Sequence, residues 1–179
     1  MRPLLLATFL MVLMLGLPAY ADETAVLGAK QAATLFTQCL RFAGDAAGLR
    51  AWIPQSGMRQ APDDQARRYL AGQSGQVFGA NSPSGSIAMG SQDDGGCSLF
   101  VDHADAEALH ASFESWLSAH GFSFQPPQID VHPVAAGVSL TARAYAISGM
   151  GRKWRVVIST TPPGGARFEA VMTAYSVTD

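Results

Sequence analysis

The residue types best suited to chemistry are histidines and glutamates at helical spacing near the middle of the chain. His103 and His110 lie seven residues apart, and Glu107 and Glu114 are placed to lie beside His110 on a helix. Such groups could transfer protons or bind zinc. A zinc site needs three or four convergent ligands, whereas this group is expected on the wet side of an amphipathic helix. We therefore expect a solvated helix face, with no metal site, no cofactor and no catalytic residue.

The chain also lacks the short motifs of common hydrolases and nucleotide-binding proteins. It contains no G-x-S-x-G, S-x-x-K or H-E-x-x-H pattern, and no glycine-rich loop ending in Gly-Lys-Ser/Thr. Catalytic groups can be scattered in sequence, so this makes an enzyme less favoured without excluding one.

A second set of residues could recognise a partner. Arginines are enriched at interface hot spots and pair well with acidic groups, and tyrosines often accompany them. One arginine is expected on each of three C-terminal strands, with tyrosines on the same strand parity. Together they predict a binding patch on the open face of a sheet, although a solvated face with cross-strand ion pairs would look the same. The candidate binding residues are Arg143, Tyr145, Arg155, Arg167 and Tyr175.

The chain has two cysteines, Cys39 and Cys97, separated by 58 positions. A redox pair would normally be Cys-x-x-Cys, so this spacing favours a structural disulfide. We expect the bridge to join a helix to a strand.

These groups must be positioned by helices and strands that the apolar pattern predicts. Residues 22–42 have helical periodicity, and Asp45 to Pro54 fit a second short helix. Residues 54–66 are polar and predict a surface connection. The segment around Arg67 fits either a short helix capped near Asp63 or an irregular approach to the sheet.

Short β-type runs separated by turn signals follow at 76–78, 86–89 and 97–101. The next helix is predicted from an N-cap at Asp102 to a stop at Gly121, with Leu109 in its apolar stripe and His110 on the opposite side.

After Pro126-Pro127 we predict a three-stranded antiparallel meander at 138–147, 153–161 and 166–177. In its first strand, Val138 and every second residue to Ala146 alternate with a set that includes Arg143 and Tyr145, and the first set is expected to face the core. The fold class is α+β, with N-terminal helices, short hairpin strands, one amphipathic helix and the meander.

The first 21 residues are typical of an export signal. Arg2 precedes an apolar run from Leu4 to Leu17, and Ala19-Tyr20-Ala21 matches a signal peptidase site. Cleavage after Ala21 would leave 158 residues, one domain at 22–179, with a formal net charge of about −3. That charge argues against nonspecific nucleic-acid binding. We expect a periplasmic location without stable membrane insertion.

The chain resembles small uncharacterised exported proteins and lipoproteins of Proteobacteria over roughly residues 30–120. The resemblance lies in the signal, the helix with Cys39, Trp52 followed by Pro54, and the Gly95-Gly96-Cys97 run, together with Val77-Phe78, Ser86 to Met89, Leu109 and Phe113. It implies the architecture and no mechanism. Unlike the lipoproteins, this chain has Asp22 rather than a cysteine directly after the expected cleavage site.

Together these features favour a non-enzymatic protein that binds another exported or periplasmic protein. It could be an immunity or inhibitor protein that neutralises an exported toxin or enzyme. An accessory subunit of an envelope or secretion assembly is the alternative. A small hydrolase with dispersed residues is a third possibility, for which His103, Glu107, His110 and Glu114 would be the first residues to test.

Overall fold

The structure is a computed structural model that describes residues 22–135 and 137–177. The expected export signal at 1–21 lies outside these residues.

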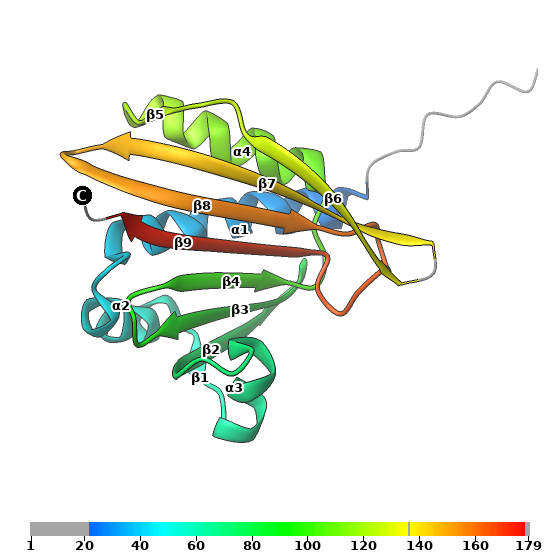
Figure 1. Cartoon of the computed structure of the whole chain (residues 1–179). Coiled ribbons are helices and arrows are strands. Elements are labelled where there is room, and N and C mark those ends of the chain that lie inside the picture. Colours follow the sequence, from blue (N-terminus) through cyan, green and yellow to red (C-terminus); the bar gives the residue numbers. More distant parts are fainter. Residues whose placement is uncertain (1–21, 136, 178–179) are drawn as a thin grey trace, which may run out of the picture.

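The described chain combines helices with one antiparallel sheet, which confirms the α+β class (Figure 1). The helices are α1 (Glu23–Phe42), α2 (Ala46–Trp52), α3 (Asp63–Leu70) and α4 (Ala106–Ala119), with a short 3₁₀ helix, η1 (Ile53–Ser56), after α2. The strands are β1 (Arg59–Gln60), β2 (Gly75–Ser82), β3 (Gly85–Gln92), β4 (Cys97–Val101), β5 (Ser123–Phe124), β6 (Gln128–Ala135), β7 (Val138–Gly149), β8 (Arg152–Thr160) and β9 (Ala170–Val177).

The sheet consists of two meanders that meet at its centre. Its strand order is β1-β2-β3-β4-β9-β8-β7, and β5 and β6 each pair with part of β7. Helix α1 precedes the first meander, β2 to β4, and α4 precedes the second, β7 to β9. The last strands of the two meanders pair, with Leu99 of β4 opposite Met172 of β9.

Both long helices pack on one face of this sheet (Figure 1). Asp22 caps α1 by accepting a hydrogen bond from the backbone N–H of Thr24 at 2.9 Å. The ring of Phe36 in α1 meets that of Phe113 in α4 at 5.7 Å. Apolar side chains from alternate strand positions complete the core beneath the helices, including Met89, Leu99, Val156, Ile158 and Met172.

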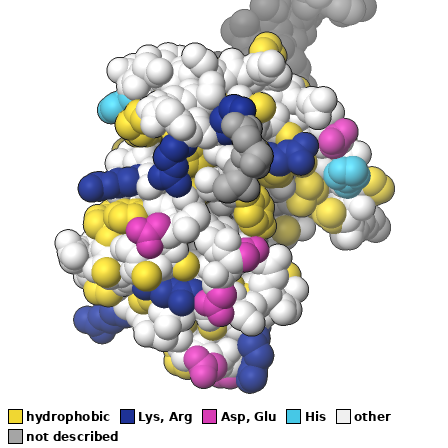
Figure 2. Space-filling view, turned by 60° about the vertical axis from the view of Figure 1, so that its left-hand side comes forward, with side chains coloured by type: hydrophobic (Ala, Val, Ile, Leu, Met, Phe, Trp, Pro, Cys, Tyr) yellow, Lys and Arg dark blue, Asp and Glu magenta, His cyan; other side chains and the backbone are white. Residues whose placement is uncertain are grey.

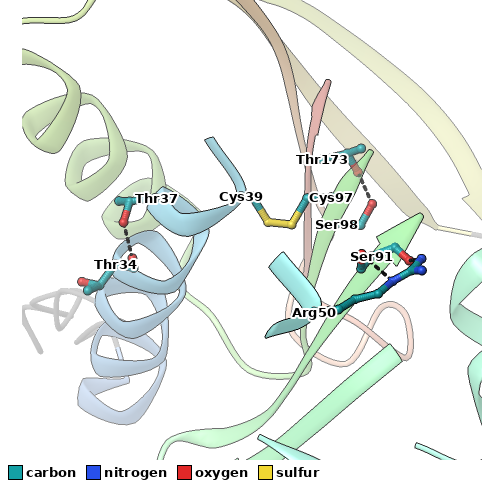
Figure 3. The surroundings of a disulfide bond; sticks show 8 residues. All are labelled: Thr34, Thr37, Cys39, Arg50, Ser91, Cys97, Ser98 and Thr173. Carbon is teal, nitrogen blue, oxygen red and sulfur yellow. Dashed lines mark hydrogen bonds between the residues drawn. A yellow bond between two sulfur atoms is a disulfide. The ribbon is translucent and has the colours of Figure 1, made fainter. Parts of the chain in front are cut away.

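The predicted disulfide between Cys39 and Cys97 is present and ties α1 to β4 (Figure 3). The glycines before Cys97 have steric roles beside it. Gly95 has φ +90° and lies so close to Gly44 that a Cβ would be 2.7 Å from its backbone. A Cβ on Gly96 would lie 2.8 Å from the ring of Tyr175. The Gly-Gly-Cys run thus allows the β3–β4 turn to pack closely against the α1–α2 connection and β9.

The opposite face of the sheet is only partly covered. Helix α3 packs there on β2 and β3, where Leu70 contacts the small cluster formed with Val77 and Ala88. Tyr69 extends this cover through ring contacts with Phe100 and Phe168. No helix of the described chain packs on this face of β7, β8 and β9, which we call the open face.

Several local expectations need correction. Asp105, rather than Asp102, caps α4 by accepting from the backbone N–H of Ala108 at 2.7 Å. Asp102 instead accepts from the N–H of Ser86 at 2.7 Å. Residues 63–70 form a helix, one of the two alternatives. The last strand begins at Ala170, and strand β6 was not predicted at all.

Candidate functional site

The five candidate binding residues do not share one face. Arg143 and Tyr145 project from β7 toward α4, where Tyr145 is 1% exposed. Arg155 and Tyr175 lie on the open face as directly opposed residues of β8 and β9. Arg167 is in the loop before β9. The predicted patch is therefore divided among three places, and of its members only Arg155 and Tyr175 lie together on the open face.

The alternation along β7 was predicted, but its two faces were assigned the wrong way round. Tyr145 and Ile147 are large enough to fill the space between the sheet and α4, and both are buried. The alanines at 142, 144 and 146 face the open side instead. Because alanine is too small to fill a helix–sheet layer, side-chain volume decides the orientation of this strand.

The histidine–glutamate group is also placed differently from expectation. His110 is 2% exposed and packs toward β7, rather than on a solvated helix face. Its Nδ1 lies 3.0 Å from the Tyr145 hydroxyl, which donates to the Glu114 carboxylate at 2.9 Å. Because the tyrosine hydroxyl donates its hydrogen to Glu114, it can only accept from His110. The geometry therefore places a proton on Nδ1 of His110, which donates to the hydroxyl oxygen.

This environment keeps both rings neutral. Burial and the nearby Arg143 guanidinium lower the pKa of His110 to about 4. Burial and the Glu114 carboxylate raise the pKa of the Tyr145 phenol above its ordinary value. Nε2 of His110 is buried without a hydrogen-bond partner among the described residues. The group therefore anchors α4 to β7 in a buried position.

The other members of the predicted group contact separate partners. Glu107 accepts from Arg143 at 2.6 Å at the edge of this layer. His103 bridges Asp22, at 2.9 Å, and the buried carboxylate of Glu169, at 3.3 Å. The hydrogen bond with Asp22 raises the pKa of His103. His103 and His110 thus share no contact that would make them one site.

Arg167 is part of the aromatic cluster at the other end of the sheet. Its guanidinium stacks at 5.1 Å from the rings of both Tyr69 and Phe168 and donates to the Tyr69 hydroxyl at 3.3 Å. A cation held between two rings stabilises the loop before β9 against α3. Its contacts are therefore with its own chain, in the loop that joins the other end of β8 to β9.

Arg155 is the candidate residue best placed for recognition. It is exposed on the open face between Ala146 of β7 and Tyr175 of β9. No ion pair or hydrogen bond connects its side chain to another described residue. The ring of Tyr175 is half-buried because it rests over Gly96.

Two adjoining hollows lie on either side of Arg155. The larger, of about 600 Å³, is lined by Arg155 with Lys153, Phe124 and Val177. The smaller, of about 210 Å³, is lined by Arg155 with Gln128 and Ala144. Gln125 and Ala146 line both, so Arg155 stands at their junction. These hollows were not predicted from the sequence. The alanines at alternate positions of β7 were the signal for them, because small side chains leave space above a sheet.

Within 22–135 and 137–177, no group of three or more His, Cys, Asp or Glu side chains is arranged to hold a metal ion. None of the helices in these ranges has the length and apolar character needed to cross a membrane.

Comparison of the chain with protein-family models, curated proteins and solved structures finds no match. The resemblance to exported proteobacterial proteins stays a prediction.

Proposed function

We propose that this protein is an exported, non-enzymatic binding protein that captures another protein through the open face of β7, β8 and β9. The observation that carries this proposal is Arg155, exposed between two hollows and without an ion pair in the described chain. An unpaired guanidinium can make two parallel hydrogen bonds to one carboxylate. The partner would therefore place an acidic side chain at this junction.

The charge around Arg155 supports an acidic partner. Three basic residues, Arg152, Lys153 and Arg155, lie within the first four positions of β8. Figure 2, which brings this end of the molecule forward, shows Lys and Arg side chains in both the upper and the lower half, whereas Asp and Glu lie mostly over the lower half. Arg152 is already used, since it donates to the carbonyls of Arg41 and Ala43. Lys153 and Arg155 have the same strand parity, and both project over the open face.

The shape of this face supports a protein rather than a small molecule as the occupant. Its floor carries small or β-branched side chains, because Thr173, Val157 and Ala144 lie in one cross-strand row. Such a floor is broad and shallow, whereas small-molecule sites enclose most of the ligand surface. Tyr175 beside Arg155 adds the aromatic contact that is enriched in protein interfaces.

Export is part of the proposal, and the disulfide supports it. The Cys39–Cys97 bridge is compatible with an oxidising compartment such as the periplasm. An immunity or inhibitor role fits a compact binding domain of this kind. An accessory role in an envelope or secretion assembly is the second candidate, and the identity of the neighbouring genes would separate the two.

A charge-reversal experiment tests the proposal. Purified protein would capture its partner from periplasmic extract, with Arg155→Glu compared with wild type. The matched control is Arg68→Glu, which reverses an exposed arginine on α3. We expect Arg155→Glu to reduce recovery of the partner more than about tenfold, and Arg68→Glu to leave it unchanged. Equal recovery with both variants would remove the open face as the binding site.

A further inference from the structure

A second surface is independent of the open-face site. Strand β6 pairs with β7 along one edge, from Gln128 opposite Ala144 to Ala135 opposite Val138. No described strand pairs with its other edge. Figure 1 shows the β6–β7 hairpin projecting past the body of the sheet. An outer strand of this kind offers free backbone donors and acceptors to another strand.

The side chains of β6 are unusual for a free edge, because they are apolar and exposed. Ile129 is 58% exposed, Val131 62% and Val134 51%. Ile129 and Val131 lie opposite Arg143 and Thr141, and therefore share one face of the hairpin. An exposed row of this kind indicates a contact surface.

The other face of β6 carries one acidic and one basic residue. Asp130 lies opposite Ala142, and His132 opposite Leu140, so both project to the same side as the open face. Both are exposed. The two residues flank Val131 symmetrically, one acidic and one basic. Two copies of this strand in antiparallel arrangement would therefore place each acidic residue opposite a basic one.

We propose that β6 pairs antiparallel with β6 of a second copy of this chain, about a two-fold axis that passes through Val131. In this register Val131 faces its own counterpart. Asp130 of each copy lies opposite His132 of the other, and Ile129 lies opposite Pro133. One face then joins apolar side chains from both copies, while the other holds two acid–base pairs.

Neighbouring registers are worse for identifiable reasons. An axis at Asp130 places two carboxylates directly opposite each other, and like charges in that position repel. An axis at His132 places His132 against itself and leaves Asp130 without a basic residue opposite. A register shifted by one residue would place Asp130 of one copy on the same face as the apolar side chains of the other copy.

The same pattern limits assembly to two copies. Pro133 has no N–H, so the shared ladder weakens at both of its ends. The opposite edge of the described sheet is β1, which has two residues. Growth beyond a dimer would need that short edge. A two-fold pair is closed, and its small contact predicts a concentration-dependent association.

Cysteine cross-linking tests the register on the whole expressed protein. Directly opposed residues of antiparallel strands have Cα atoms about 4.5 to 5.5 Å apart, within disulfide range. Val131→Cys should therefore give a disulfide-linked dimer on mild oxidation. The matched control is Ile129→Cys on the same face, because in this register the two copies of residue 129 lie about 13 Å apart. It should stay unlinked.

A charge-swap series measures the association itself by sedimentation across a wide concentration range. His132→Asp creates two opposed carboxylate pairs and should raise the dissociation constant about tenfold or more. The double change Asp130→His with His132→Asp restores both pairs and should restore the dimer. Leu27→Lys, at an exposed apolar position on α1, is the control and should have no effect.

A wild-type chain that is monomeric at every concentration would overturn this proposal. Equal cross-linking of the Val131→Cys and Ile129→Cys variants would also overturn it, as would a failure of the double swap to restore what His132→Asp removes. Because these variants lie on β6, their outcome is separate from that of Arg155→Glu.

Discussion

The hydroxyl of Tyr145 lies 3.0 Å from Nδ1 of His110, and this contact joins the second meander to α4 through two buried polar groups. The same hydroxyl donates to Glu114 at 2.9 Å. A side chain expected to bind a partner is thus a structural link between a strand and a helix. The Tyr145 hydroxyl, Nδ1 of His110 and the Glu114 carboxylate are paired with one another in a layer where unpaired groups are costly.

Replacing Tyr145 with phenylalanine should lower the free energy of unfolding by about 1 to 3 kcal/mol, because the Nδ1–H of His110 would stay buried without an acceptor. Urea unfolding measures this. The control is Tyr69→Phe, whose hydroxyl makes only the 3.3 Å contact with Arg167. We expect it to change stability by less than about 0.5 kcal/mol. Similar losses in both variants would argue against the buried link.

Stability should fall on acidification because of His110. Folding lowers the pKa of His110 from its ordinary value of 6.5 to about 4. Between these two pH values the unfolded chain binds a proton that the folded chain does not. The contribution of His110 is therefore full above pH 6.5 and decreases as pH falls, by about 3 kcal/mol in total near pH 4.

The direct check is the pH dependence of unfolding for wild type and His110→Gln. The variant should be less stable at neutral pH and should lose less stability between pH 6.5 and 4. His103 acts in the opposite direction, since its raised pKa makes its contribution largest at low pH and smaller as pH rises. Comparing the two proteins cancels this effect. Parallel curves would contradict a buried neutral His110.

Removing the Cys39–Cys97 bridge should destabilise the protein strongly. The bridge closes a loop of 58 positions, for which chain entropy predicts about 4 kcal/mol. The double variant Cys39→Ala with Cys97→Ala should show this loss in urea unfolding under non-reducing conditions. Mass measurement of the wild type without reductant supplies the control. Two free thiols in that measurement would be incompatible with the bridge.

Glu169 should contribute more to stability than its place in a loop suggests. Its buried carboxylate accepts from the N–H of Ala104 and of Gly164, each at 3.0 Å. Glu169→Ala should therefore cost about 2 kcal/mol or more. Glu107→Ala removes an exposed carboxylate that pairs with Arg143, and should cost less than about 1 kcal/mol. If both changes had equal effects on the thermal midpoint, the buried carboxylate would not hold this loop.

The long helices and the disulfide could be predicted because their signals are local or compositional. Leu109 and Phe113 recur at helical spacing, and two cysteines in one chain have one way to pair. The orientation of β7 could not be predicted from polarity alone, because Tyr145 is both amphipathic and large enough to fill the core. The space between β7 and the helix that faces it decides which side chains of this strand point to the core.

The candidate site was only partly predictable for a related reason. Arg155 and Tyr175 lie on neighbouring paired strands, so strand parity places them together correctly. Arg167 was misplaced because β9 starts three residues after it. Strand β6 is stabilised by pairing with β7, and nothing local distinguishes its short alternation of Ile129, Asp130 and Val131 from a loop.

The most direct test of the open-face account is site-specific photocross-linking in the producing cell. A photoreactive phenylalanine analogue would replace Tyr175, which lies directly opposite Arg155, and Tyr69 at the far end of the sheet would serve as the control position. The account predicts a discrete protein adduct from position 175, none of the same mass from position 69, and loss of that adduct when Arg155→Glu is added. An adduct at 175 that persists with Arg155→Glu, or the same adduct from both positions, would contradict it.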